Sequence, residues 1–108
     1  MASWSVFLTA DAVNDLEHIL DYIERHDSSE RADYVYEQIK QTILSLHTAP
    51  KRGRVVPELK DIGVFEYREV FFKPYRIVYY TVQRTVFVFA IFDGRRNLED
   101  VLHRRLLP

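Results

Sequence analysis

The feature that most constrains this chain is a pair of apolar strands separated by one short polar turn. Residues 75–82 form the first expected strand, and residues 86–92 are apolar on both faces. A strand that is apolar on both sides has to be covered on both sides, so we place residues 86–92 at the centre of a sheet. Arg76 stands near the start of the first strand, and Arg95 and Arg96 follow the second. An arginine side chain can grip a phosphate or a carboxylate in a planar fork, so these strands indicate a binding surface as well as a fold.

The N-terminal half predicts a short strand followed by two helices. Residues 3–8 alternate as a strand, and Thr9 can cap the helix that follows. The apolar residues of this helix recur at three- and four-residue steps and are Val13, Leu16, Leu20 and Ile23. Polar residues then interrupt the pattern, and Ser28 or Ser29 can cap a second helix. Its apolar stripe consists of Ala32, Val35, Tyr36, Ile39, Ile43 and Leu46. Two helices joined by so few residues favour an antiparallel hairpin.

The C-terminal half predicts mostly strands. Residues 48–63 have the composition of a linker-like loop, with the basic run 51–54 inside it. A loop of this length in a small domain is often functional or mobile. A strand over residues 65–72 and a turn at residues 73–74 precede the two apolar strands, and Asn97 can cap a last short helix.

This order of elements predicts one small α/β (α+β) domain over residues 1–108, with the order β-α-α-β-β-β-α. The sheet is expected to be antiparallel, with the N-terminal helical hairpin packed on one of its faces. The remaining chain has little with which to cover the other face. An apolar face left open would need a partner.

The charge of the chain is divided between its two halves. Residues 1–50 hold nine acids and three bases, a net charge of −6, and residues 51–108 hold seven acids and twelve bases, a net charge of +5. Either both halves are simply solvated, or the C-terminal half meets an anionic partner. The overall charge of −1 argues against non-specific nucleic-acid binding, which usually needs a strongly basic domain.

Several kinds of site are excluded or disfavoured by composition. The chain has no cysteine, which excludes disulfides, thiolate metal sites and cysteine nucleophiles and fits the reducing cytoplasm, where we expect the protein to reside. No apolar run approaches the roughly 18–20 residues that span a bilayer, so no membrane partner is expected. His18, His26 and His47 have no spacing with an acid that suggests zinc, and we expect neither a metal nor a cofactor.

Three stretches carry a resemblance to a known family. They are residues 8–16 at the start of the helical hairpin, Tyr75-Arg-Ile-Val-Tyr79 in the first apolar strand, and Gly94-Arg-Arg-Asn-Leu98 after the second. Together, and over nearly the whole chain, they resemble the toxins of the RelE/ParE superfamily of bacterial type II toxin–antitoxin systems, closer to the ParE-like branch. The resemblance implies a small α/β protein with an antiparallel sheet and a cognate antitoxin that wraps and neutralises it. It also implies one of two targets: mRNA in the ribosomal A site, which RelE-like toxins cleave, or DNA gyrase, which ParE-like toxins poison.

The catalytic positions of the RelE-like branch are only partly matched. RNA cleavage through the 2′-hydroxyl needs a base, an acid and cations for the phosphate. Arg76 and Arg96 match in position the two arginines that RelE-like toxins use for the phosphate. Tyr67 and Glu69 stand where that branch has lysines, and Leu102 stands where it has a tyrosine. The unmatched positions favour the ParE-like branch, which is not known to need a catalytic constellation.

A ribonuclease built from other groups is the alternative, with Glu69 as the base, His103 as the acid, and Arg76 and Arg96 as the cations. Each residue also has a structural interpretation. Glu69 in a strand more often pairs with an arginine such as Arg76 or Arg68 on a neighbouring strand. His103 on a short terminal helix is more often a solvated side chain, favoured by the helix C-terminus.

The surface that meets the antitoxin or the target is expected near the C-terminal end of the chain. The contact candidates are Arg76, Arg95, Arg96, Leu98, Leu102 and Leu106. The leucines are either apolar anchors for the antitoxin or part of the chain's own core. The sequence therefore predicts a toxin that stabilises plasmids, poisons DNA gyrase and forms a hetero-oligomer with its antitoxin. The alternatives are a ribosome-dependent mRNA endonuclease and a decayed homologue that binds the antitoxin without being toxic.

Overall fold

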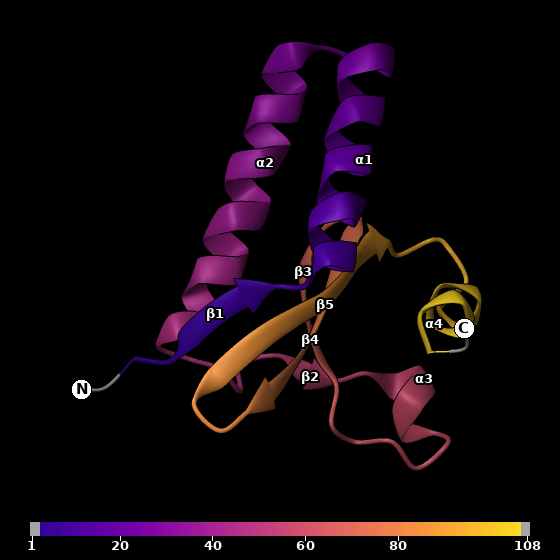
Figure 1. Cartoon of the computed structure of the whole chain (residues 1–108). Helices are drawn as coiled ribbons and strands as arrows, with labels where there is room; N and C mark the ends of the chain where they lie inside the picture. The colour runs from indigo at the N-terminus through magenta and orange to yellow at the C-terminus, as the bar shows by residue number, and fades with distance from the viewer. Residues whose placement is uncertain (1–2, 107–108) are drawn as a thin grey trace.

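The computed structural model describes residues 3–106, except for the side chains of His103, Arg104 and Leu106. Its five-stranded sheet has the order β1-β5-β4-β3-β2 (Figure 1). The strands are β1 (Ser5–Leu8), β2 (Arg54–Val55), β3 (Arg68–Phe72), β4 (Tyr75–Val82) and β5 (Thr85–Asp93). The helices are α1 (Ala10–His26), α2 (Ser29–Leu44), α3 (Pro57–Lys60) and α4 (Leu98–Leu106), and a single 3₁₀ turn, η1 (Ser45–His47), follows α2. The predicted α/β (α+β) class is confirmed.

The helical hairpin begins at the predicted caps. The Thr9 hydroxyl accepts a hydrogen bond from the Ala12 N–H at 3.2 Å, and the Ser28 hydroxyl accepts one from the Arg31 N–H at 3.0 Å. Each bond satisfies a backbone donor that the first turn of a helix leaves without a partner. The resulting antiparallel pair, α1 and α2, covers one face of the sheet and projects beyond it (Figure 1).

The sheet is mixed, which corrects the prediction of a wholly antiparallel sheet. Strands β3, β4 and β5 form an antiparallel meander, but β1 pairs parallel to β5, from Ser5 opposite Thr85 to Leu8 opposite Val88. Short turns force successive strands to reverse, whereas no such turn joins β1 to β5. β5 is an interior strand between β1 and β4, and β4 is the middle strand, so the placement of residues 86–92 at the centre was wrong by one strand.

Two apolar clusters lie on opposite faces of the sheet. The cluster beneath the hairpin consists of Ala12, Val35, Ile39, Ile43, Leu46, Val70, Ile77, Tyr79, Val86, Val88 and Ile91. The other cluster consists of Val56, Leu59, Val78, Ala90, Phe92, Leu98, Val101 and Leu102. The second face is thus partly closed by α3 and α4, which the prediction of an open face did not foresee. The reason is that residues 48–63 contain β2 and α3 and not only a loop.

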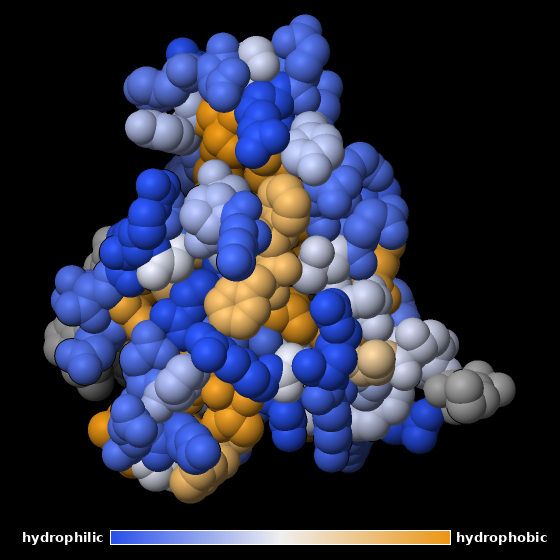
Figure 2. All heavy atoms as spheres, turned by 180° about the vertical axis from the view of Figure 1, so that it is seen from behind, coloured by the Kyte–Doolittle hydropathy of each residue, from blue (hydrophilic) through white to orange (hydrophobic). Residues whose placement is uncertain are grey.

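Some apolar surface stays open beside the second cluster. Phe7 stacks on Phe87 with ring centroids 6.2 Å apart, and Phe87 stacks on Tyr80 at 5.4 Å. After α3, Ile62 and Phe65 are also exposed. Seen from the back, the surface is mostly hydrophilic, and hydrophobic atoms gather in a narrow central band and at the lower end (Figure 2). On this face, the exposed apolar surface is therefore divided into patches.

The remaining predicted elements differ from the structure at one point and agree with it at another. The strand expected over residues 65–72 begins at Arg68, because its pairing with β4 ends where Arg68 faces Tyr79. The Asn97 side chain accepts the Glu99 N–H at 2.9 Å, which confirms it as the cap of α4. Within residues 3–106, no helix is both long and apolar enough to cross a membrane.

Candidate functional site

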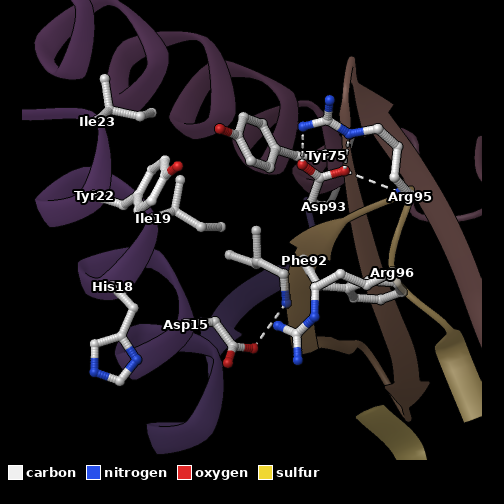
Figure 3. A pocket seen from close by; sticks show the side chains of 11 residues that line it. Asp15, His18, Ile19, Tyr22, Ile23, Tyr75, Phe92, Asp93, Arg95 and Arg96 are labelled. Carbon is white, nitrogen blue, oxygen red and sulfur yellow. Dashed lines mark hydrogen bonds and ion pairs between the residues drawn. The ribbon is translucent and has the colours of Figure 1, made fainter. Parts of the chain in front are cut away.

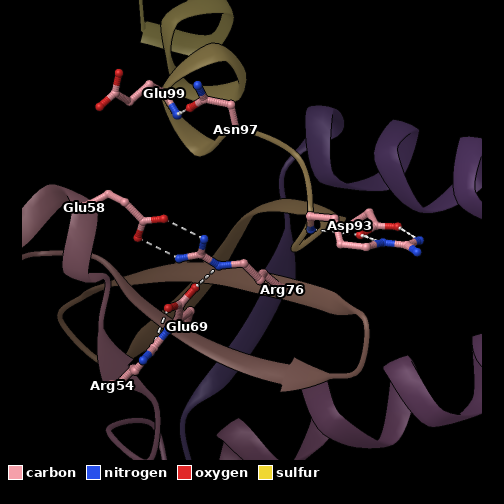
Figure 4. A network of polar contacts seen from close by, with 8 residues as sticks. Arg54, Glu58, Glu69, Arg76, Asp93, Asn97 and Glu99 are labelled. Carbon is pink, nitrogen blue, oxygen red and sulfur yellow. Dashed lines mark hydrogen bonds and ion pairs between the residues drawn. The ribbon is translucent and has the colours of Figure 1, made fainter.

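Four charged residues from four elements meet on the side of the sheet that faces α3 (Figure 4). Arg76 comes from the start of β4 and Glu69 from β3, while Arg54 lies in β2 and Glu58 in α3. Glu69 stands opposite Val78 in the register, and Arg76 stands opposite Phe71. Their side chains therefore meet diagonally across the two strands, which lies within the reach of long side chains.

The guanidinium of Arg76 is bound on two sides by carboxylates. Its Nε donates to Glu69 Oε1 at 2.6 Å, and its two terminal amino groups donate to the two oxygens of Glu58 at 2.7 and 2.9 Å. The second Glu69 oxygen accepts from Arg54 Nε at 2.8 Å. The Arg76 guanidinium carbon also lies 5.4 Å from the centre of the Phe92 ring. Bidentate arginine–carboxylate contacts of this kind are among the strongest hydrogen bonds in proteins.

The contact between Arg76 and Glu58 favours the charged forms of both side chains. The hydrogen bonds from Arg76 hold the pKa of Glu58 below its usual value, and those from Glu58 raise the pKa of Arg76 further above neutrality. Two acids and two bases compensate each other in charge. Because Arg76 is only 8 % exposed and Glu69 only 1 %, this central pair is shielded from solvent, whereas the side chains of Arg54 and Glu58 reach it.

The structural interpretation of Glu69 as a strand partner of Arg76 is confirmed. Both Glu69 oxygens carry a hydrogen bond from an arginine, so this carboxylate has no oxygen turned toward a substrate. The two terminal amino groups of Arg76 in turn bind the carboxylate of Glu58 and do not face an open cleft. The side chain of His103, the proposed acid, lies outside the described part of the chain. Among the described side chains, the proposed base Glu69 and the proposed cation Arg76 are thus bound to each other.

Sequence reasoning missed Glu58 and placed Arg54 only within a basic run. The available signal for Glu58 was its place directly after Pro57, since proline is favoured at the first position of a helix. No pattern in the sequence indicates that this one-turn helix packs above Arg76. That contact depends on Val56 and Leu59, which are buried in the second apolar cluster and anchor α3.

Replacing Glu58 with glutamine is expected to make stability less sensitive to acid. Glu58 has a lowered pKa in the folded protein, so it contributes stability above its ordinary value of 4.5, and this contribution is lost as pH falls through the folded pKa. Urea unfolding between pH 7 and pH 3 should show wild type more stable than Glu58→Gln at pH 7 and the two converging in acid. Glu37→Gln, on the exposed surface of α2, serves as the control. A Glu58→Gln difference that stays constant with pH would contradict the ion pair.

A second group of charged residues, which includes Arg95 and Arg96, lies where the chain leaves β5. The Nε and the backbone N–H of Arg95 both donate to Asp93 Oδ1 at 2.9 Å, and a terminal amino group contacts the other Asp93 oxygen. This pairing holds the pKa of Asp93 below its usual value. Arg96 is exposed and forms no ion pair with any side chain in the described part of the chain. Both arginines border a cavity of about 410 Å³ between α1 and the end of β5 (Figure 3).

Two of the three leucines predicted as contacts are buried in the protein's own core. Leu98 is 2 % exposed and Leu102 6 %, both in the second apolar cluster, and the side chain of Leu106 lies outside the described part of the chain. Arg105 fastens α4 to the rest of the molecule by contacting Asp15 of α1 and donating to the Phe89 carbonyl at 2.8 Å. In the free chain, these two leucines therefore hold α4 against the sheet.

Metal binding has no support in the described residues. Between residues 3 and 106, leaving aside the side chains noted above, no group of three or more histidine, aspartate or glutamate side chains is placed to hold a metal ion. The described residues therefore offer one neutralised charge network and, beside the cavity, one exposed arginine, Arg96, that forms no ion pair with them.

Comparison with known proteins gives the family of the chain. The family model described as the ParE toxin of the type II toxin-antitoxin system parDE matches residues 6–98. No curated protein matches the chain significantly. Among solved structures, the chromosomal ParDE system from P. aeruginosa is similar with a TM-score of 0.71 and 18 % identity, covering 83 % of this chain and 95 % of that one. The toxin–antitoxin complex RelBE2 from Mycobacterium tuberculosis is similar with a TM-score of 0.58 and 20 % identity, covering 86 % of this chain and 93 % of that one. Because the family match spans most of the chain, the protein belongs to the ParE toxins of type II toxin–antitoxin systems, within the RelE/ParE superfamily.

Proposed function

We propose that the protein inhibits growth by binding and poisoning DNA gyrase, without cleaving RNA, and that a cognate antitoxin neutralises it. The observation that carries the proposal is the neutralisation of Arg76 and Glu69 inside the protein. To bind Arg76, a phosphate would have to displace Glu58 or Glu69. To act as a base, Glu69 would have to break its ion pairs with Arg54 and Arg76 before it could accept a proton. Separating Glu69 from Arg76 would leave a shielded charge without its partner, which typically costs several kcal/mol.

Family membership supports the same proposal. ParE-like toxins are expected to act by binding their target, and the near-neutral charge of this chain does not favour an RNA substrate. The two similar structures are described as a ParDE system and a toxin–antitoxin complex, which supports an antitoxin as a partner of this chain. A cytoplasmic location, where gyrase works, and a role in plasmid stabilisation are part of the proposal.

One observation favours ribosome-dependent mRNA cleavage as the second candidate. Arg96 stands where the RelE-like branch has a phosphate-binding arginine, and its side chain has no ion pair among the described side chains. A single exposed arginine can bind a phosphate, but RNA cleavage also needs a base and an acid. The Glu69 oxygens are both occupied, so this candidate requires a base outside the network described above.

Purified gyrase distinguishes the candidates. With supercoiled plasmid and ATP, the protein should reduce supercoiling and increase the amount of cleaved plasmid recovered after detergent treatment, and its antitoxin should abolish both effects. Under the same conditions, mRNA on programmed ribosomes should stay intact. If gyrase activity is unchanged and the mRNA is cleaved, the proposal is wrong and the second candidate, mRNA cleavage, takes its place. Unchanged gyrase and intact mRNA would indicate the decayed homologue.

A further inference from the structure

The cavity beside Arg96 has an apolar floor and aromatic sides. Ile19 and Ile23 come from α1, and Phe92 comes from β5. Tyr22 and Tyr75 stand on opposite elements, and Tyr22 is 63 % exposed, so the cavity is open to solvent along α1. Figure 3 shows the α1 side chains on one side and Asp93 with the two arginines on the other. An open cavity of about 410 Å³ with these walls suits one large apolar side chain from outside.

The fixed carboxylates at this cavity are already occupied. Asp15 accepts the Ile91 N–H at 3.0 Å and contacts Arg105, while Asp93 takes the side chain and the N–H of Arg95. Arg96 forms no ion pair with a carboxylate of the described part of the chain, although its charge acts on Asp93 together with that of Arg95. The rim of the cavity therefore presents one arginine that forms no ion pair with the described side chains, next to an apolar floor.

The backbone that carries Arg96 is held in place before any partner arrives. The Gly94 N–H donates to the Pro74 carbonyl at 2.7 Å, and the Arg96 N–H donates to the Asp93 carbonyl at 3.0 Å. A Cβ on Gly94 would lie 3.0 Å from that Pro74 oxygen, so the turn packs closely on the β3–β4 turn. A group fixed in this way loses less conformational freedom on binding.

We infer that this cavity binds a segment of a partner protein in which a large apolar side chain stands next to a carboxylate. The apolar side chain packs on Ile19 and Phe92 between the two tyrosines, and the carboxylate pairs with Arg96. The inference rests on the proposed function in one respect, that the toxin acts and is neutralised through protein contacts. Charge complementarity at Arg96 selects an acidic segment over a neutral or basic one.

Two matched peptides test this inference directly. The probes are acetyl-Ala-Phe-Asp-Ala-amide and its Asn counterpart, titrated against the ¹⁵N-labelled full chain at low salt while the amide signals of α1 and of residues 91–96 are followed. The Asp peptide should bind about three- to fivefold more tightly than the Asn peptide, as expected for one solvent-exposed ion pair. Arg96→Gln should abolish this preference, whereas Lys40→Gln, which removes an exposed charge on α2, should retain it.

The apolar half of the site needs a second variant. Tyr22→Ala removes an exposed ring and is expected to leave the fold intact while weakening both peptides equally. Equal affinity of the two peptides for wild type, or signals that shift elsewhere than at this cavity, would overturn the inference. So would inorganic phosphate that shifts the same signals as strongly as the Asp peptide, because the occupant would then be a phosphate group. None of these outcomes depends on gyrase, so failure here and failure of the proposed function can be told apart.

Discussion

Replacing Arg76 with methionine is expected to lower the free energy of unfolding by about 3 kcal/mol, the lower end of the range for breaking a buried ion pair. The substitution leaves the fully shielded Glu69 carboxylate with Arg54 alone, an arginine whose own side chain is more than half exposed. Glu58, being partly exposed, can return to water. Urea unfolding at pH 7 measures this loss. A lower urea concentration at the midpoint, with an unchanged dependence of the free energy on urea, shows that the stability has fallen.

The double variant Arg76→Met with Glu69→Met is expected to recover at least half of that loss. It removes both shielded charges and replaces them with apolar side chains of similar length, an exchange that is often neutral in a protein interior. The remaining residues, Arg54 and Glu58, reach solvent. The loss in free energy of unfolding should be smaller in the double variant than the sum of the losses in the two single variants. A loss equal to that sum would contradict the coupling of Arg76 to Glu69.

The same double variant also tests the role of the network in the cell. If Arg76 and Glu69 are structural, the folded double variant should stop growth as effectively as wild type at equal expression. A double variant that folds and unfolds normally yet has lost its toxicity would mean that these residues touch the target or a substrate. Comparing stability and toxicity in one variant separates the two roles.

Gly53→Ala is expected to cost about 2–3 kcal/mol, in the range for adding a methyl group to a closely packed site. A Cβ there would lie 2.6 Å from the Glu69 carbonyl oxygen and 2.8 Å from the Tyr79 hydroxyl. The segment cannot easily move away, because the Gly53 N–H donates to that hydroxyl at 3.1 Å and its carbonyl accepts from Arg68 at 2.7 Å. Close approach, and not an unusual backbone angle, is what requires glycine at this position.

Gly63→Ala is the matched control for Gly53→Ala. Gly63 has a φ of +84°, and a Cβ added to it would have no neighbouring atom within 4 Å, so alanine there meets only backbone strain. That strain is worth about 1 kcal/mol. Thermal or urea unfolding of both variants should rank Gly53→Ala as the more damaging. Equal losses would mean that the segment before β2 shifts to accept a side chain.

The helical hairpin and the strand meander could be predicted because their signals are local. Thr9 and Ser28 cap the helices that their sequences predict, and residues 75–82 and 85–93 pair across a turn of two residues. The parallel pairing of β1 could not be predicted, since it brings together residues about 80 positions apart and no local pattern records its direction. The closure of the second sheet face was missed for a similar reason, because it depends on a helix of one turn.

The candidate site was predictable in its residues but not in its geometry. The sequence indicates Arg76 or Arg68 as the partner of Glu69, because strands bring such residues within reach of each other, and the structure selects Arg76. Glu58 joins them from residues 48–63, whose composition indicates only a loop. The sequence likewise does not distinguish Arg95 from Arg96. In the structure, Arg95 pairs with Asp93, whereas Arg96 forms no ion pair with the described side chains at the cavity that both arginines border.

The most direct test of the central claim is to induce the protein alone in bacteria and follow labelled thymidine and labelled methionine incorporation over the first minutes. Poisoning of gyrase predicts that DNA synthesis falls first, while protein synthesis continues through that interval. A prior fall in methionine incorporation would contradict the account and return Arg76, Arg96, Glu69 and His103 to consideration as residues of an mRNA endonuclease.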